Sequence, residues 1–271
     1  MIRIGVRSFV AGGEYTPSDA DALAFVNAAA ITDETQKLAI NNLVTDLKGY
    51  SIWTKMKAIY PFVGGTSSTH KWNLKDPRDL DAAFRLVFNG GWTHNSNGAK
   101  PNGTNAFANS FLKLQTNFSA NSFSFNYYSR TQILNNSGEI GVSGSGLQFS
   151  LHYYYNGNSE KSIVGGSYPA NSARINNSNT LGFQIGTRTA SNVLKLHFNG
   201  NLLVTNTNNY VSGFNNFNIY LGAINSSGTS AVEYSNKECA FAALGNGLTD
   251  TEAANFYTAV QAYQTTLSRN V

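Results

Sequence analysis

The chain contains a single cysteine, Cys239, among its 271 residues. One thiol excludes an internal disulfide, and it excludes any metal site built from several cysteines. Cys239 lies in the apolar run ECAFAAL, so we expect a small buried core residue there and not a reactive thiol.

Charged side chains are also scarce. They make up 13% of the residues, against about 25% in typical soluble domains, and Asn, Ser, Thr and Gly supply the polar surface instead. The net charge is +4, without any run of Lys and Arg. This pattern argues against a nucleic-acid partner, and the weak long-range field argues against recruitment of a partner by charge.

Long apolar stretches are absent as well. No segment approaches the roughly 20 apolar residues of a membrane-spanning helix, and the opening MIRIGVRSFVAGGEY lacks the apolar core of a signal peptide. We therefore expect a chain made in a cytoplasm, with no membrane insertion. Its Asn- and Ser-rich strands are nevertheless typical of proteins that work outside cells. A virus particle, assembled in the host cytoplasm and released by lysis, satisfies both observations.

Two helices are predicted between residues 17 and 48. Thr16-Pro17 offers a cap followed by proline at the first helical position, and Thr32 is the expected cap of the second helix. Gly64-Gly65 then marks a break in the pattern. We expect residues 1–65 to form an N-terminal helical segment that serves for attachment.

From about residue 68 the pattern becomes one of short β-strands. Segments such as NSFSFNYYSR and GLQFSLHYYYNGNSE alternate apolar and polar residues between clusters of Asn, Ser and Gly. Asn199-Gly200, in LKLHFNGNLLVTN, is a strong hairpin signal. Many short strands without intervening helices predict an antiparallel sandwich over 66–271. The absence of a repeat of roughly 20–50 residues argues against a solenoid or a propeller.

The sequence ends with the signal for one amphipathic helix. Thr249 and Glu252 have the spacing of a capping box, in which each side chain bonds the backbone amide of the other residue. The residues expected on its apolar face follow at helical spacing: Ala253, Phe256, Tyr257, Val260, Tyr263, Gln264 and Leu267. We expect this helix to cover the sheet.

The acidic residues do not form a catalytic pair. Retaining hydrolysis of a glycan needs two carboxyl groups about 5 Å apart, which positions i and i+2 of a strand provide. Between Lys113 and Lys237 the acids are Glu139, Glu160 and Glu233, and they have no such spacing. We therefore expect no enzymatic activity.

Metal and cofactor signals are weak too. The four histidines show no pair at ligand spacing, and no phosphate-binding loop or dinucleotide fingerprint occurs. Calcium prefers several carboxylates or carbonyls, and DPRDLD is the one acidic cluster. Its aspartates are expected to cap a turn or to pair with Arg78 and Arg85, so no metal and no cofactor is expected.

Three stretches follow one another in a recognisable order. They are FNGGWTHNSNGAKPNGTNAFANS…NSFSFNYYSR, then LKLHFNGNLLVTNTN, then IYLGAIN…KECAFAALGNGLTDTEAANFY. Together they resemble the concanavalin A-like (laminin G-like) lectin and glucanase superfamily over roughly residues 84–260. The resemblance implies a mainly-β antiparallel jelly-roll sandwich, here with an N-terminal helical segment and a C-terminal amphipathic helix. Many such domains hold calcium through Asp side chains, whereas the matching loops here carry Asn and Ser.

A narrower resemblance concerns residues 52–110 and the ending LTDTEAANFYTAVQAYQTTL. Both are similar to segments of structural proteins of bacteriophages that infect Bacteroidetes hosts. This resemblance implies a virion component: a fibre, a spike, or a capsid or tail decoration. It also implies other virion proteins as partners and a homo-oligomer, with a trimer as the expected state because fibres and spikes usually trimerise.

Binding is the activity that the residues favour. Sugars are recognised by aromatic faces and by amides and hydroxyls. GGWTHNSNG places Trp92, His94 and Asn95 on an expected loop, and HYYYNGN places Tyr154 and Asn156 at a strand end. We predict these five as the contacts of a host-surface polysaccharide. Strand alternation sends about half of the tyrosine cluster into the core.

Two hypotheses stay open at this point. The first is a lectin-like virion protein that binds a host glycan. The second is a purely structural or assembly protein of the particle, attached through its N-terminal helices and without a glycan site. A secreted cellular lectin is disfavoured by the missing signal peptide.

Overall fold

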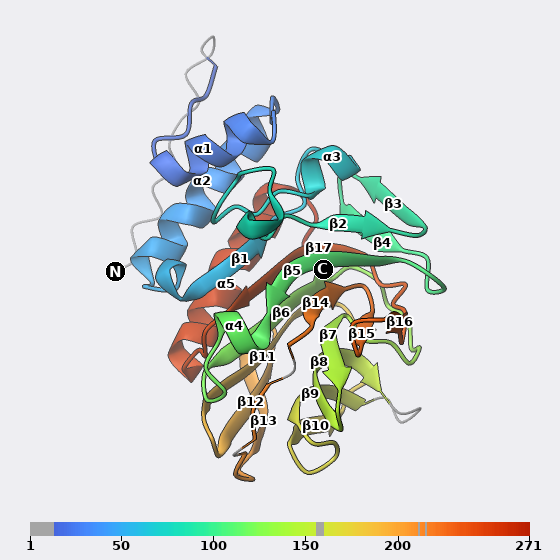
Figure 1. The fold of residues 1–271 in the computed structure, drawn as a ribbon. Helices are drawn as coiled ribbons and strands as arrows, with labels where there is room; N and C mark the ends of the chain where they lie inside the picture. Colours follow the sequence, from blue (N-terminus) through green and yellow to red (C-terminus); the bar gives the residue numbers. More distant parts are fainter. Residues whose placement is uncertain (1–13, 156–159, 211, 215) are drawn as a thin grey trace.

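Short strands with alternating apolar residues pair into two sheets in the computed structural model, which describes residues 14–155, 160–210, 212–214 and 216–271 (Figure 1). Sheet A runs in the order β13 (Asn201–Asn206), β12 (Val193–Phe198), β11 (Gly182–Ala190), β6 (Phe123–Ser129), β17 (Cys239–Gly245), β4 (Gly98–Pro101) and β3 (Trp92–Asn95), and β1 (Met56–Tyr60) also pairs with β17.

Sheet B packs on one face of sheet A. Its order is β10 (Ser172–Asn176), β9 (Glu160–Gly166), β8 (Leu147–Tyr155), β7 (Ile140–Gly144), β14 (Asn218–Leu221), β5 (Phe107–Lys113) and β2 (Val87–Asn89). Off this path, β15 (Ile224–Ser226) pairs in parallel with β7 and antiparallel with β16 (Ser230–Val232). The other strand pairs of the described chain are antiparallel. The predicted antiparallel sandwich is therefore confirmed.

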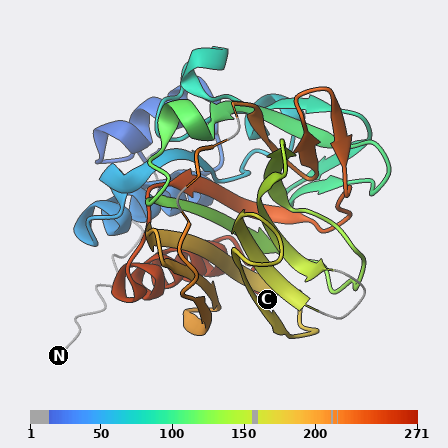
Figure 2. The ribbon, with the colours of Figure 1, turned by 60° about the horizontal axis from the view of Figure 1, so that its bottom comes forward.

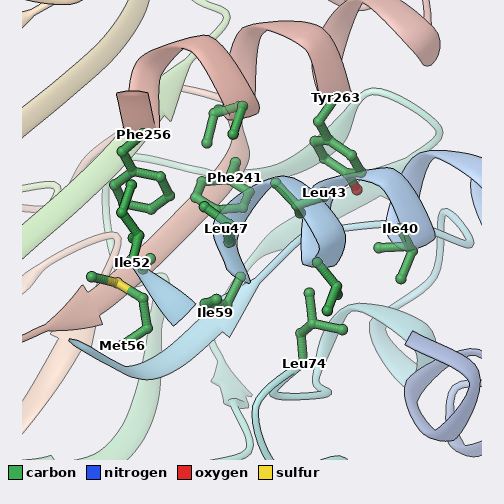
Figure 3. Packing of buried hydrophobic residues seen from close by; sticks show 14 of the residues in the cluster. Ile40, Leu43, Leu47, Ile52, Met56, Ile59, Leu74, Phe241, Phe256 and Tyr263 are labelled. Carbon is green, nitrogen blue, oxygen red and sulfur yellow. The ribbon is translucent and has the colours of Figure 1, made fainter. Parts of the chain in front are cut away.

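Helices cover the other face of sheet A, so the molecule has three layers (Figures 1 and 2). The long helices are α1 (Ala20–Ala28), α2 (Glu34–Gly49) and α5 (Asp250–Thr266), and the short ones are α3 (Ser67–His70), α4 (Leu114–Asn117) and the 3-10 turns Trp53–Lys55 and Asp81–Ala83. Figure 3 shows Leu43 and Leu47 of α2 facing Phe256 and Tyr263 of α5 around Phe241 of β17.

Strand β17 explains the apolar run that contains Cys239. Phe241 and Ala243 face the helix layer, whereas Ala242 and Leu244 face sheet B. A strand buried on both faces loses the alternation of a half-exposed strand. Cys239 is 1% exposed, so its predicted place in the core is confirmed.

The predicted Asn199-Gly200 hairpin and the predicted capping box of the last helix are both confirmed. β12 and β13 form a hairpin whose turn residue Asn199 has φ 48° and Gly200 φ 80°, the left-handed region that Asn-Gly favours. Thr249 and Glu252 form the capping box of α5. The predicted apolar face is buried at Ala253, Phe256, Val260, Tyr263 and Gln264.

The predicted caps of the first two helices were wrong by a few residues. Asp19, and not Thr16, caps α1 and accepts hydrogen bonds from the amides of Asp21 and Ala22. Asp33, and not Thr32, caps α2 and accepts from the Gln36 amide at 2.8 Å. Both aspartates also place a negative charge at the positive end of a helix dipole.

The expected N-terminal segment, 1–65, contains more than helices. β1 lies within it and pairs with β17, with Tyr60 opposite Ala242. The core beneath the helices also continues across residue 65, since it includes both Val63 and Leu74.

Candidate functional site

The hairpin β3–β4 carries Trp92, His94 and Asn95 at one end of sheet A; they lie on strand β3, so the expected loop was wrong. Its turn begins at Asn95, whose Oδ1 accepts from the Asn97 amide at 2.7 Å. Gly98 has φ 146°, and a Cβ there would lie 2.2 Å from the Cys239 carbonyl oxygen. A glycine is therefore required where this hairpin meets β17.

Trp92 is half-buried and fixed by its neighbours. Its Nε1 donates to the Asn89 carbonyl at 3.1 Å. Its ring contacts the Phe88 ring edge-on, with the two ring centroids 5.2 Å apart. A Cβ at Gly222 would lie 2.8 Å from the indole, so that side of the ring is in close contact with backbone. The indole is thus held in place mainly by packing.

His94 is oriented by a second histidine that the sequence did not indicate. His70, buried on α3, accepts from the Gly65 amide through Nε2 at 3.2 Å, and its Nδ1 lies 3.0 Å from Nδ1 of His94. Burial, with smaller contributions from His94 and Arg269, lowers the pKa of His70 to about 3. His70 is therefore neutral, its Nδ1 donates to His94, and the remaining proton of His94 sits on Nε2.

Asn95 belongs to a polar network that reaches the C-terminus. Its Nδ2 donates to Glu238 Oε1 at 3.1 Å, and Glu238 in turn pairs with Arg130 at 3.1 Å. Arg130 Nε donates to the carbonyl oxygen of Arg269 at 2.7 Å. The hairpin is thereby bonded to the end of the chain.

A polar pocket of about 220 Å³ lies beside this hairpin turn. The first turn of α2, the segment after β1, the β3–β4 turn and the residues at the end of α5 enclose it, with the lining residues Asp33, Thr35, Gln36, Val63, Ser96, Thr266, Leu267, Ser268 and Arg269. Most of these side chains end in a hydroxyl or an amide.

The charged residues of the pocket already have partners. Asp33 caps α2, and the guanidinium of Arg269 donates to Gln264 and to backbone carbonyls. The hydroxyls of Thr35, Ser96 and Ser268 have no hydrogen-bond partner within the described part of the chain. Arg269 therefore offers no free cation to a ligand, whereas the hydroxyls of Thr35, Ser96 and Ser268 are available.

Trp92, His94 and Asn95 lie on the neighbouring hairpin but do not line this pocket, and the other two predicted contacts do not join the hairpin. Tyr154 is half-buried on β8 of sheet B and forms an isolated bridge with Ser137. Asn156 lies outside the described residues. Within the described chain, no contact links Tyr154 to Trp92, His94 or Asn95.

Strand alternation held for only part of the tyrosine cluster. Alternation places Tyr153 and His152 on opposite faces of the strand, yet both are fully buried. His152 Nε2 lies 2.7 Å from Ser150 Oγ, and its Nδ1 lies 3.0 Å from the Ser137 carbonyl oxygen. A half-buried strand in this region was therefore the wrong expectation.

The three acids between Lys113 and Lys237 each lie beside a different basic side chain. Glu139 is fully buried beside Lys237. Glu160 lies 3.6 Å from Arg174, and Glu233 lies 3.7 Å from His152. Outside the strands, DPRDLD forms the expected ion pairs with Arg78 and Arg85.

Metal and membrane features are absent from the described ranges. These residues include no group of three or more His, Cys, Asp and Glu side chains arranged to hold a metal ion. They also include no helix of the length and apolarity that crossing a membrane requires.

Comparisons with known proteins show the fold. No family model and no curated protein matches the chain. A mutant of Trypanosoma rangeli sialidase displaying trans-sialidase activity is similar in structure, with a TM-score of 0.55 and 15% identity over 83% of this chain and 39% of that one. The chain thus spans well under half of that sialidase.

Two further solved structures are similar at lower scores. Domain 4 of AbnA, a GH43 extracellular arabinanase from Geobacillus stearothermophilus in complex with arabinotriose, gives a TM-score of 0.45 and 16% identity over 74% of this chain and 98% of that one. The binding domain of botulinum neurotoxin serotype D gives a TM-score of 0.48 and 12% identity over 77% of this chain and 52% of that one. The likeness to the sialidase, at 15% identity, shows the fold alone, which is the two-sheet antiparallel sandwich expected from the sequence.

Proposed function

We propose that the chain is a non-catalytic, glycan-binding sandwich protein of a bacteriophage particle, and that the pocket beside the β3–β4 turn holds a neutral sugar of the host surface. The observation that carries the binding proposal is the pocket itself. Its volume of about 220 Å³ and its neutral hydroxyl and amide lining suit a polyhydroxylated ligand.

The neutrality of the ligand follows from the state of the charged lining residues. Burying an unpaired charged group of a ligand requires an opposite charge or several hydrogen bonds. Arg269 is engaged by Gln264 and by carbonyl oxygens, and Asp33, which accepts from the Gln36 amide, is itself an anion, so the lining offers no free cation to an acidic sugar. A sugar hydroxyl, in contrast, finds partners at Thr35, Ser96 and Ser268.

The fold is consistent with this class of ligand. The sialidase that shares the sandwich at a TM-score of 0.51 was solved with 2,3-difluorosialic acid, a charged sugar derivative. That likeness covers 38% of the sialidase chain, so the neutral pocket here, and not the likeness, decides the kind of sugar that we propose.

The virion assignment and the absence of catalysis rest on other observations. The similarity of residues 52–110 and of the C-terminal ending to phage structural proteins supports a place on the particle. The separation of Glu139, Glu160 and Glu233 into different contacts supports binding without hydrolysis, because a glycosidase needs its carboxyl groups across one bond.

A panel of immobilised neutral and acidic polysaccharides tests the binding proposal. We expect retention on one or more neutral glycans, with no release of reducing ends. Absence of binding at millimolar sugar would contradict the glycan site and favour the structural hypothesis. Mass spectrometry of purified phage particles tests the virion assignment separately, since a chain absent from the particles cannot be a virion protein.

A further inference from the structure

Lys237 and Glu139 form an ion pair that is completely buried at one end of the sandwich. Their side chains are 0% exposed, and Lys237 Nζ lies 3.2 Å from Glu139 Oε1. Lys237 precedes β17 of sheet A and Glu139 precedes β7 of sheet B. Taking both charges out of water is costly, and removing both often stabilises a protein, so the pair calls for an explanation beyond stability.

The carboxylate is fixed by further hydrogen bonds. Glu139 Oε1 accepts from Ser137 Oγ at 2.8 Å and from Ser235 Oγ at 3.1 Å, and Oε2 accepts from the Tyr153 amide at 2.8 Å. Both oxygens are therefore held at defined positions beside the lysine.

A carboxamide completes the group. Lys237 Nζ also donates to Asn135 Oδ1 at 2.7 Å, and to Ser137 Oγ at 2.9 Å. The amine thus touches the amide group of Asn135 on one side and the carboxylate of Glu139 on the other.

We propose that Lys237 and Asn135 become joined by an intramolecular amide bond, with Glu139 as the proton carrier. Glu139 takes a proton from the Lys237 ammonium, and the freed amine adds to Cγ of Asn135. The C–N bond to the Asn135 amide nitrogen then breaks. Glu139 returns its proton to that nitrogen, which leaves as ammonia, and then takes the second proton from the Lys237 nitrogen, so a secondary amide and a protonated Glu139 carboxyl remain. No oxidant, reductant or additional reactant is needed.

The surroundings favour this reaction over its alternatives. Contact between the reacting groups replaces a bimolecular encounter, and burial keeps out the water that would hydrolyse the amide instead. Asn135 is half-buried while its two partners are fully buried, so the ammonia has a route to solvent. Lys161, a second buried lysine, instead donates to the backbone carbonyl of Asn179, which is not a carboxamide side chain.

The bond would connect the two sheets covalently. It links the segment that leads into β7 with the segment that leads into β17, 102 residues apart. A cross-link over so long a loop restricts the unfolded chain strongly. It would supply the covalent lock that a protein with one cysteine cannot obtain from a disulfide.

Intact-mass measurement of the purified full chain, after denaturation, tests the proposal. We expect a mass lower than the sequence mass by one ammonia, and a tryptic digest in which residues 131–161 are joined to 196–269, because trypsin does not cleave after an acylated lysine. A succinimide at an asparagine also loses ammonia, but it joins no peptides and reopens in mild base.

Three variants test the roles of the groups. Asn135→Ala, at a half-buried loop position, and Lys237→Arg should both show the full sequence mass of the variant. Glu139→Gln should do so too, or should lose ammonia far more slowly, with an unchanged circular dichroism spectrum. Lys161→Arg is the matched control and should keep the deficit. Recovery of the wild type at its sequence mass, or a deficit without linked peptides, would overturn the proposal.

Discussion

Replacing Arg269 by Met should destabilise the protein more than any change at its surface. Arg269 is 1% exposed and follows α5. Its Nε donates to Gln264 Oε1 at 2.7 Å, its Nη1 to the Phe62 carbonyl at 2.8 Å, and its Nη2 to the carbonyls of Pro61 and Ala240, both at 2.9 Å. One side chain therefore bonds α5, β17 and the segment after β1.

The size of the expected loss of unfolding free energy follows from the groups that Arg269→Met leaves without a partner. Met fills much of the volume, but four buried acceptors lose a charged donor. A hydrogen bond to a charged group contributes about 1.5–3 kcal/mol, and such losses are not additive because the acceptors relax together. We expect a loss of about 3–5 kcal/mol, the range for removing a buried charged partner. Arg269→Lys should cost about half as much, because an ammonium cannot reproduce the fork of the guanidinium.

Urea unfolding followed by circular dichroism measures these differences. The control is Arg174→Met. The Arg174 side chain is 37% exposed and its ion pair with Glu160 is long, at 3.6 Å. Such surface pairs contribute about 0–1 kcal/mol to the free energy of unfolding. If Arg269→Met lowers the free energy of unfolding by less than about 1 kcal/mol with an unchanged slope, the proposed anchoring of α5 is wrong.

Three further predictions concern the hairpin and the helix layer. Gly98→Ala should weaken the docking of β3–β4 and lower the melting temperature, because its Cβ would meet the Cys239 carbonyl at 2.2 Å, whereas Gly49→Ala, with nothing within 4 Å, should be neutral or stabilising. Since the pKa of His70 falls from 6.5 to about 3 on folding, the unfolded chain binds more protons between these values. The free energy of unfolding should therefore decrease as the pH falls below about 6.5. In urea titrations at pH 4.5–6.5, His70→Gln should reduce the slope of this free energy against pH by up to about 1.4 kcal/mol per pH unit. An unchanged slope would contradict this. Phe256→Ala should cost about 3–5 kcal/mol of unfolding free energy, because Phe256 is fully buried against Phe183 and Phe241; a cost below about 1 kcal/mol would mean that α5 is not part of the core.

The elements predicted correctly from the sequence are those whose cause is local. The capping box of α5 and the Asn199-Gly200 turn each depend on a few neighbouring residues. The strand β1 was missed because MKAIY becomes a strand only by pairing with β17, whose residues lie far along the chain. Its short apolar run has no period that distinguishes it from other buried segments.

The site was only partly predictable for the same reason. Trp92, His94 and Asn95 could be singled out because aromatic and amide residues cluster in one short stretch, but none of them lines the pocket. Their partners were not, since His70 and Glu238 come from distant segments. The pocket draws Thr35, Ser96 and Ser268 from three parts of the chain, and isolated Ser and Thr residues carry no local signal in a sequence so rich in them.

The glycan-binding claim is tested most directly by calorimetric titration of the best-retained neutral glycan into three proteins. These are the wild type, the double variant Thr35→Val/Ser96→Ala and, as the control, Tyr154→Ala on the other sheet. Each lost hydroxyl contact costs about 1 kcal/mol, so the double variant should bind roughly 10- to 30-fold more weakly. The control should bind as the wild type does. Unchanged affinity in the double variant, or a loss in Tyr154→Ala alone, would contradict a glycan site in this pocket.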